Sequence, residues 1–365
     1  MHVPDGFIDA PVSLAAGVVA AGAVAAGLRG ARRELGAARV GSLGGDDRTA
    51  PLAGLVAAFV FAAQMLNFPV AAGTSGHLLG GALAAILVGP WTGVLCISVV
   101  LLMQGILFAD GGLSALGVNI LLMGVVTVVV AWALFRGLTA VLPRGRRAVT
   151  AASFVAALVS VPASAAAFTL LYALGGVTEV PLGSVLTAMV GVHVLIGIGE
   201  AAITALTVGA VLAVRPDLVY GARGLTAPLK LRVGGELVDA PAPEPAPARS
   251  PRGVWIAGLA ASLVLAGFLS FYASGDPDGL ERVASDKGFD ASAEEHAGAG
   301  SPLADYGVEG VGNARLSGGL AGVIGVGATV AVGTGAFYAV GTGAFYAVRR
   351  RRAPQEHDEA PRNSA

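Results

Sequence analysis

The first two residues of the chain carry nitrogen atoms at a spacing that could chelate a metal ion. The α-amine of Met1, the backbone nitrogen of His2 and the imidazole of His2 can close a five-membered and a six-membered ring around one ion. Three nitrogens in one plane leave a fourth corner open, and tetragonal nitrogen geometry favours Ni(II) or Cu(II) and also suits low-spin Co(II). The alternative is an inert histidine on an exposed tail. Against it, Pro4, Asp5 and Gly6 form a turn sequence that could return the terminus to the rest of the molecule.

His77 is a candidate for the fourth corner. It lies in FPVAAGTSGHLLGGAL at 68–83, where Pro69 is expected to end one helix and a new helix to begin near His77, with irregular backbone between them. Irregular backbone at membrane depth is tolerated only where protein or a water-filled cavity satisfies it. A histidine at such a break is therefore a candidate ligand. The alternative is that it hydrogen-bonds the unsatisfied end of a helix.

Two ionisable residues share a helix face further along the chain. His193 and Glu200 are seven residues apart in GVHVLIGIGEAA at 191–202, and ionisable residues inside a membrane span indicate function by default. They could form a proton or metal relay, or a polar pair that orients the ligands and the neighbouring helices. We favour the second role.

Other polar residues are weaker candidates. Asp110, in FADGG at 108–112, could attract cations, although an ordinary turn explains it as well. His296 lies among acidic residues of a later loop, where a solvated surface is the simpler interpretation than one that concentrates cations. The position of His357, in the charged tail, gives no indication of a function. Three amide side chains near the ends of predicted spans could line a cavity: Asn67, Gln104 and Asn119.

The composition indicates that a membrane protein must position these residues. Of the 365 residues, 55% are hydrophobic and 13% are charged, which is too apolar for a soluble domain of this size. A helix needs about 20 residues to cross the hydrocarbon core. Nine candidate spans follow, the third of them short: 11–28, 51–69, 77–89, 91–108, 114–135, 148–174, 183–214, 253–273 and 317–348. The first is not expected to be a cleavable signal peptide, because acidic rather than basic residues precede it.

The distribution of basic residues predicts the orientation. The loops at 29–50, 136–147 and 215–252 and the tail from 349 hold 20 of the 23 Lys and Arg residues, and such loops are cytoplasmic by the positive-inside rule. We therefore expect the amino terminus outside and the carboxyl terminus inside. The net charge of −1, with no basic patch outside these short loops, gives no indication of nucleic-acid binding.

The chain is predicted to contain two membrane modules. The predicted divisions are a seven-span domain at 1–232, a Pro/Ala-rich cytoplasmic linker at 233–252, a two-span hairpin at 253–352 and a disordered cytoplasmic tail at 353–365. The loop at 274–315 within the hairpin is predicted to lie outside and carries nine acidic residues. The sequence VGTGAFYA occurs twice in tandem at 332–347, which we interpret as a local duplication that lengthens the last span.

The sequence lacks the motifs that are typical of several classes of enzyme. The chain has two lysines, and neither lies in a GxxxxGK[ST] phosphate loop, so ATP hydrolysis by that route is excluded. There is no serine nucleophile elbow and no HExxH zinc helix. The single cysteine, Cys96, excludes an intramolecular disulfide and is interpreted as a small buried hydrophobe. We expect a transporter component that is not an enzyme and takes its energy from partners or an ion gradient.

Four separated motifs, in order along 1–232, resemble the CbiM/NikM family. They are MHVPDGF at 1–7, GTSGHLLGG at 73–81, FADGGLSALGVNI at 108–120 and HVLIGIGEA at 193–201. In the second module, PDGLERVASDKGF at 277–289 and SPLADYGV at 301–308 resemble the PDGLE domain, an accessory membrane component that is often encoded separately. The chain therefore resembles a fusion of two components.

The resemblance implies a fold, a cargo and partners. It implies an all-α integral membrane protein of a prokaryotic plasma membrane, with a seven-helix bundle and a two-helix hairpin. Such proteins are the substrate-capture components of cobalt and nickel energy-coupling-factor transporters, and they work with a transmembrane coupling subunit and ATPase subunits. Co(II) or Ni(II) would be the transported substrate. It would be bound by the Met1 amine, the His2 backbone nitrogen, the His2 imidazole and the His77 imidazole. Cobalt, feeding cobalamin synthesis, is narrowly preferred, and the PDGLE hairpin is expected to help seat or release the amino-terminal loop.

Two alternatives from other classes remain. The chain could be a proton-coupled secondary metal carrier that uses His193 and Glu200 as its relay. It could also be a structural or assembly protein of the membrane whose amino terminus only resembles a chelator. The first predicts uptake by the isolated chain that an uncoupler abolishes, and the second predicts no stoichiometric metal.

Overall fold

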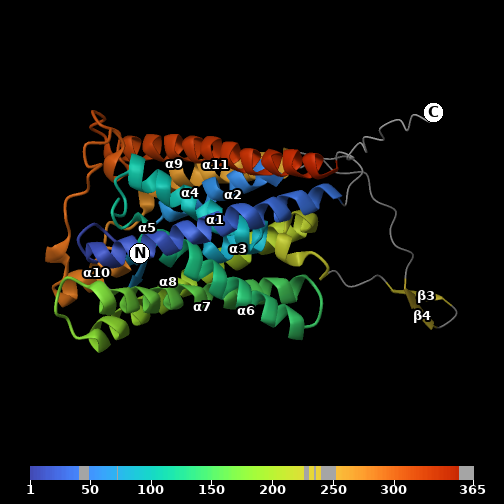
Figure 1. Ribbon diagram of the computed structural model, residues 1–365, viewed down its shortest axis with the longest axis horizontal. Helices are drawn as coiled ribbons and strands as arrows, with labels where there is room; N and C mark the ends of the chain where they lie inside the picture. Colours follow the sequence, from blue (N-terminus) through green and yellow to red (C-terminus); the bar gives the residue numbers. More distant parts are fainter. Residues whose placement is uncertain (41–48, 72, 226–229, 234–235, 240–251, 353–365) are drawn as a thin grey trace, which may run out of the picture.

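The structure, a computed structural model, describes residues 1–40, 49–71, 73–225, 230–233, 236–239 and 252–352. The regular secondary structure of the described part is helical apart from two short hairpins and one isolated β-bridge between Ile8 and Gly176 (Figure 1). The helices of the first part are α1 Ala10–Val40, α2 Thr49–Gln64, α3 Gly81–Val88, α4 Pro90–Leu107, α5 Leu116–Asn119, α6 Thr127–Val141, α7 Arg146–Gly175 and α8 Leu182–Val214. Those of the second part are α9 Arg252–Gly267, α10 Gly279–Lys287 and α11 Ala314–Arg352. The strands are β1 Phe68–Ala71, β2 Thr74–Gly76, β3 Lys230–Val233 and β4 Glu236–Asp239.

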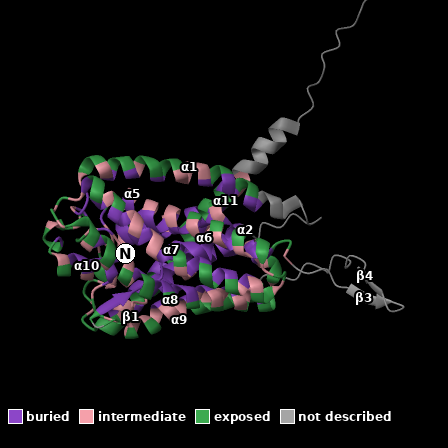
Figure 2. Ribbon diagram, turned by 90° about the horizontal axis from the view of Figure 1, so that it is seen from below, coloured by how far each residue is buried: buried purple, intermediate pink, exposed green. Residues whose placement is uncertain are grey.

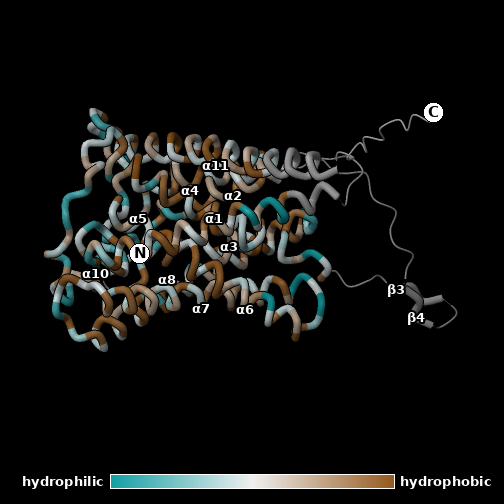
Figure 3. Tube along the Cα trace, viewed as in Figure 1, coloured by the Kyte–Doolittle hydropathy of each residue, from teal (hydrophilic) through white to brown (hydrophobic). Residues whose placement is uncertain are grey.

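Seven segments of the described chain are long and apolar enough to cross a membrane. They are Ala10–Leu35, Pro90–Leu107, Leu116–Val141, Arg146–Gly175, Leu182–Val214, Arg252–Tyr272 and Ala314–Thr342. Figure 3 shows hydrophobic residues along these helices and hydrophilic ones at both ends of the bundle. Leu116–Val141 is continuous because a π-helix at Ile120–Val126 joins α5 to α6. The prediction of an all-α, multi-pass membrane protein is confirmed.

The remaining two predicted spans, 51–69 and 77–89, form shorter helices. They correspond to α2, of 16 residues, and α3, of 8 residues. At 1.5 Å per residue, α3 covers only about 12 Å. Seven of the nine predicted spans are therefore long enough to cross a membrane as a single helix. Both short helices still belong to the bundle interior, since every residue of α3 is buried and most of α2 is buried as well.

The segment between these two short helices differs from the prediction. Helix α2 ends at Gln64, before Pro69, and β1 and β2 then form an antiparallel hairpin. The next helix begins at Gly81, so the predicted start near His77 was wrong by four residues. The reason is that the Leu79 and Gly80 N–H groups donate to the Glu200 carboxylate of α8, so helical partners are not needed there. Gly80 has φ +85°, which interrupts helical geometry.

The second module packs tightly on the first through small residues. Helix α11 lies along α2, where a Cβ placed on Gly54 would come within 2.2 Å of Thr334 Oγ1. Helix α9 meets α11 in the same way, because a Cβ on Gly322 would lie 2.3 Å from the Ala266 carbonyl oxygen. Such close approach is how helices associate in membranes. In contrast, α1 exposes large apolar residues along its length (Figure 2), which suits a surface against lipid.

The loop between α9 and α11 lies at the end of the bundle that holds the amino terminus. Figure 1 shows α10, in this loop, beside Met1 and far from the opposite end of α11. The predicted orientation requires this placement, although the side of the membrane that this end faces stays a prediction. The β3–β4 hairpin crosses the predicted division at 232, which therefore does not fall at the end of an element. Most of the predicted linker, at 240–251, and the tail with His357 lie outside the described residues.

Candidate functional site

The amino-terminal loop is buried and fixed by the loop that follows α4. Met1 is 1% exposed and Val3 is fully buried. The Asn119 side chain pairs with the main chain of Val3 in both directions, accepting from its N–H at 2.7 Å and donating to its carbonyl at 3.0 Å. The Asp5 carboxylate accepts from the Leu113 and Ser114 N–H groups at 3.1 and 2.8 Å. The chain terminus is therefore docked in the bundle rather than exposed.

The Met1 amine lies against two side chains that are far away in the sequence. Its nitrogen is 2.6 Å from His77 Nε2 and 2.7 Å from Asp278 Oδ2. His77 Nδ1 lies 3.0 Å from the Leu78 carbonyl oxygen, which can only accept a hydrogen bond. In its neutral form the ring carries its proton on Nδ1 and directs the lone pair of Nε2 at the amine. The structure thus brings together two of the predicted ligands, the Met1 amine and His77.

The third predicted ligand, His2, stacks on His77. Their ring centroids are 5.0 Å apart, with 20° between the ring planes. His2 Nδ1 lies 3.3 Å from Asp110 Oδ1, and Nε2 lies 3.2 Å from Gln104 Oε1. Burial lowers the pKa of His2 to about 4, although the nearby Asp110 carboxylate opposes this. The lowered pKa favours a neutral ring. Because the Asp110 carboxylate can only accept, a metal on Nδ1 would replace both the proton there and the contact with Asp110, leaving the ring proton on Nε2.

Asp278 is a site residue that the sequence interpretation missed. It comes from the second module, at the start of α10, and closes the site beside the terminus. Burial would raise the pKa of this carboxyl group, but the Met1 ammonium and the His77 ring together outweigh burial and hold it well below its usual range. The sequence carried a partial signal, because Asp278 and Glu281 have the spacing of a capping box. Nothing in the sequence placed that helix start beside Met1.

Glu200 and His193 lie next to the site without contacting one another in the described structure. Glu200 is fully buried and accepts from Leu79 N at 2.6 Å and Gly80 N at 3.1 Å, which fixes the backbone immediately after His77. His193 Nδ1 is 2.7 Å from the Met189 carbonyl, while its Nε2 has no partner in the described part of the chain. This geometry fits the favoured role of orienting neighbours.

The remaining predicted residues fall around the same end of the bundle. Asp110 accepts a hydrogen bond of 2.5 Å from the Tyr306 hydroxyl, in addition to its contact with His2. His296 lies in a loop whose residues 293–295 are exposed, as predicted, but its own side chain is half-buried, with Nε2 3.2 Å from the Gly111 carbonyl of the first module. The main-chain carbonyl of Asn67 accepts a hydrogen bond from Ser274 N of the second module at 2.7 Å. Three parts of the second module therefore cover the loops around the terminus.

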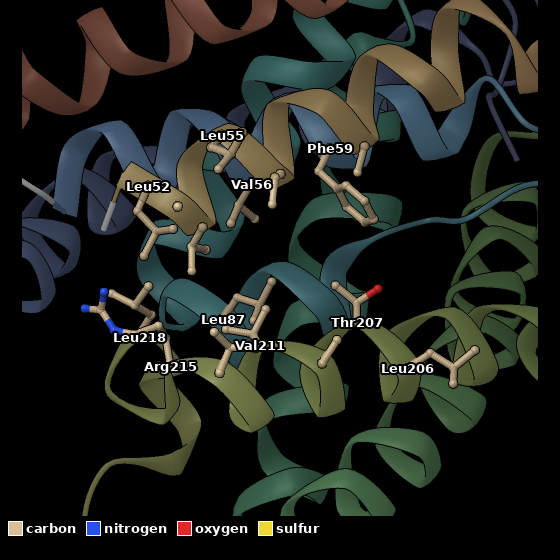
Figure 4. A pocket seen from close by; sticks show the side chains of 17 residues that line it. Leu52, Leu55, Val56, Phe59, Leu87, Leu206, Thr207, Val211, Arg215 and Leu218 are labelled. Carbon is tan, nitrogen blue, oxygen red and sulfur yellow. The ribbon is translucent and has the colours of Figure 1, made fainter. Parts of the chain in front are cut away.

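Side chains alone do not make a metal cage in the described ranges. The described ranges contain no group of three or more His, Cys, Asp and Glu side chains arranged to hold an ion. A cavity of about 680 Å³ lies elsewhere, between α2, α8 and α9 (Figure 4). Its lining is mainly leucine and valine, with the guanidinium of Arg215 as its charged group. Because it offers no imidazole or carboxylate, it is not the candidate metal site.

The fold and the site together define a multi-pass α-helical membrane protein whose amino terminus is buried against a histidine and covered by a second membrane module. The CbiM model, described as a cobalt uptake substrate-specific transmembrane region, matches residues 2–218. The PDGLE domain model matches residues 252–342. The chain belongs to the CbiM family and carries a PDGLE domain after it.

Individual sequence relatives have names that refer to metal transport. A protein of Haloquadratum walsbyi, named on inference as a metal transport protein, is 40% identical over 60% of this chain and 94% of its own length. A protein of Archaeoglobus fulgidus, named on inference as the fused nickel transport protein NikMN, is 37% identical over 60% of this chain and 68% of its own length. A solved structure described as a transition metal transporter is 25% identical, with a TM-score of 0.49, over 59% of this chain and 93% of that one.

Proposed function

We propose that this chain is the substrate-capture membrane component of an importer for Co(II) or Ni(II). The ion would be bound by the Met1 amine, the His2 backbone nitrogen, His2 Nδ1 and His77 Nε2. The observation that carries the proposal is the distance of 2.6 Å between the Met1 nitrogen and His77 Nε2 at a buried terminus. The proposal includes a free amine on Met1.

The distance fits the coordination that this dipeptide would impose. Amine, peptide nitrogen and imidazole occupy three consecutive corners of a square, so the fourth corner is adjacent to the amine. With metal–nitrogen bonds of about 2.0 Å, adjacent corners lie about 2.8 Å apart. The amine and His77 Nε2 are therefore already near the separation that a square-planar ion requires. Binding needs the amine and the peptide nitrogen to lose protons, so affinity should increase with pH.

Two considerations bear on the choice between cobalt and nickel, and they favour different metals. The family description names cobalt uptake, and cobalt is our narrow preference. Four nitrogen donors bind nickel somewhat more tightly than cobalt by the usual affinity order. Supply and partners would then decide which ion is imported.

Energy for uptake would come from a transmembrane coupling subunit and ATPase subunits, as in energy-coupling-factor importers. The chain lacks a phosphate loop of its own. The alternative of a proton-coupled carrier needs a relay between His193 and Glu200, and their contacts are instead to Met189 and to the backbone at Leu79 and Gly80. The PDGLE module would seat the amino-terminal loop, since the Glu294 N–H donates to the Asp5 carbonyl at 2.9 Å.

An amino-terminal extension tests the proposed ligands without altering any side chain. One added residue would place the histidine third, where the new amine, two peptide nitrogens and the imidazole supply four donors without His77. We therefore choose Gly-Ser-Gly added before Met1, which leaves no terminal amine near His2. The purified chain should lose stoichiometric Ni(II), while the same three residues added after Ala365 should have no effect. Retention of one Ni(II) per chain by the amino-terminally extended protein would contradict the proposal.

A further inference from the structure

The second module contributes a carboxylate whose orientation is set independently of the terminus that it contacts. Asp278 Oδ1 accepts from Leu280 N at 2.7 Å and Glu281 N at 2.9 Å, which caps α10. The Glu281 side chain accepts from Asp278 N in return, at 2.9 Å. This reciprocal pair satisfies the first N–H groups of the helix. One oxygen is thereby committed to α10, and the other, Oδ2, is left to face the site.

The position of α10 is fixed just as firmly by the first module. Ser75 N donates to the Pro277 carbonyl at 2.9 Å, and Ser75 Oγ donates to the Asp276 carbonyl at 2.7 Å. Gly279 lies so close to α8 that an added Cβ would be 2.8 Å from Ile196 Cδ1. The start of α10 is thus attached on both sides of Asp278.

This placement directs Asp278 Oδ2 at the terminal amine. Oδ2 is 2.7 Å from the Met1 nitrogen and 3.6 Å from His77 Nε2, and all three groups are almost completely removed from solvent. A buried charge is costly unless it is paired and hydrogen-bonded. The carboxylate gives the amine such a partner beside the imidazole.

We propose that Asp278 is a positioning residue of the capture site, which holds the Met1 amine beside His77 both before and after the ion binds. This inference rests on the proposed function. An ammonium group has three N–H bonds, and an amine bound to a metal keeps two, so the hydrogen bond to Oδ2 survives when the ion enters. At the amine, the contact that the ion replaces is the one to His77 Nε2. Carboxylates that hydrogen-bond metal ligands in this way orient them and raise affinity.

The charges around the ion support this role. Without metal, the ammonium and the Asp278 carboxylate cancel. With metal, a divalent ion and one deprotonated peptide nitrogen leave a net charge of +1, which the same carboxylate cancels again. Asp278 therefore balances the charge of the ammonium group and that of the ion with its peptide nitrogen, without becoming a ligand, while Asp110 beside His2 adds one negative charge in both states.

Asp278→Asn and Asp278→Ser test the proposal in the full-length chain. Asn and Ser are both good helix caps, so α10 keeps an acceptor for its first N–H groups, but neither presents a carboxylate oxygen to the amine. The matched control is Asp286→Asn, which removes the same charge from the exposed face of the same helix, where Asp286 pairs with Arg282. Thermal unfolding of all variants checks that the fold is retained.

The readouts are Ni(II) affinity and the ligand-field spectrum of the Ni(II)-saturated protein. We expect Ni(II) to bind about tenfold to hundredfold more weakly in both Asp278 variants, the range for a hydrogen bond to a charged group. Asp286→Asn should stay within twofold of the unaltered chain, and saturated Asp278 variants should keep its spectrum because the ligands are the same. Unchanged affinity in both variants would overturn the inference, as would an altered spectrum, which would make Asp278 a ligand. If the unaltered chain bound no Ni(II), the proposed function itself would have failed.

Discussion

Each predicted ligand is held by neighbours from a different part of the fold. The backbone that carries His77 is fixed by Glu200, the His2 ring by Asp110 and Gln104, and the Met1 amine by Asp278. These neighbours come from α8, from the region at the end of α4 and from the second module. Because ligand geometry depends on such supporting residues, substitutions outside the ligand set should change metal affinity.

Replacing Glu200 with glutamine tests this expectation inside the bundle. The amide keeps one acceptor oxygen, but its NH₂ group would face the second of the Leu79 and Gly80 N–H groups, so one hydrogen bond is lost. A hydrogen bond to a charged group contributes about 1.5–3 kcal/mol. Ni(II) affinity, measured by isothermal titration, should fall at least tenfold.

The control for Glu200→Gln is Thr187→Ala on the same helix. Thr187 is exposed, and its hydroxyl donates only to the Gly183 carbonyl one turn earlier. It should bind Ni(II) within twofold of the unaltered chain. Equal affinities for the two variants would show that Glu200 does not position the backbone at His77.

At the residue scale, the sequence predicted the chelating atoms but not their supports. Chelation depends on atoms within Met1 and His2, so it can be recognised in the local sequence. The support from Asp278 depends on docking between segments separated by 277 positions. A periodic pattern reports which face of an element is apolar, and it does not report which distant helix end meets that face.

At the scale of elements, the amino-terminal loop and the loop after α4 form one interlocked unit. Gly112 N donates to the Val3 carbonyl at 2.9 Å, and the Asp5 carboxylate binds the N–H groups that follow. A Cβ on Gly112 would lie 2.3 Å from Asp5 N. The site therefore depends on a backbone approach that only glycine permits.

Gly112→Ala should displace the amino-terminal loop without altering a ligand. Overpacking of this kind typically costs about 1–3 kcal/mol, so Ni(II) affinity should fall about tenfold to hundredfold. Gly183→Ala is the matched control, because a Cβ at that position meets nothing within 4 Å. Metal titration of both variants checks the prediction. An unaffected Gly112→Ala protein would mean that the loop is not held in this way.

The long elements could be predicted from the sequence, whereas the short ones could not. Hydrophobic runs such as Leu182–Val214 can be recognised as membrane spans because a span needs about 20 apolar residues. The segment from Pro69 to Gly81 was misjudged because its N–H groups are satisfied by a β-hairpin and by Glu200. Hydrogen bonds supplied by another part of the chain leave no local pattern.

At the scale of the whole molecule, the second module covers the end of the first that contains the candidate site. Besides Asp278, it provides Tyr306 to Asp110 and His296 to the Gly111 carbonyl. The Asp305 N–H also donates to the Phe108 carbonyl at 2.9 Å. A bound ion would therefore be enclosed between the modules, and loading or release would require their loops to separate.

The most direct test of the account is the metal stoichiometry of the purified chain, with Co(II)/Ni(II) competition, for the unaltered protein, His2→Ala and His77→Ala. We predict one ion per unaltered chain, loss of that ion in both variants, and release of up to two protons on binding, one from the ammonium group and one from the peptide nitrogen. The competition would rank the two metals. An unaltered chain without metal, or one ion retained in both variants, would contradict a capture site built on the amino terminus and His77.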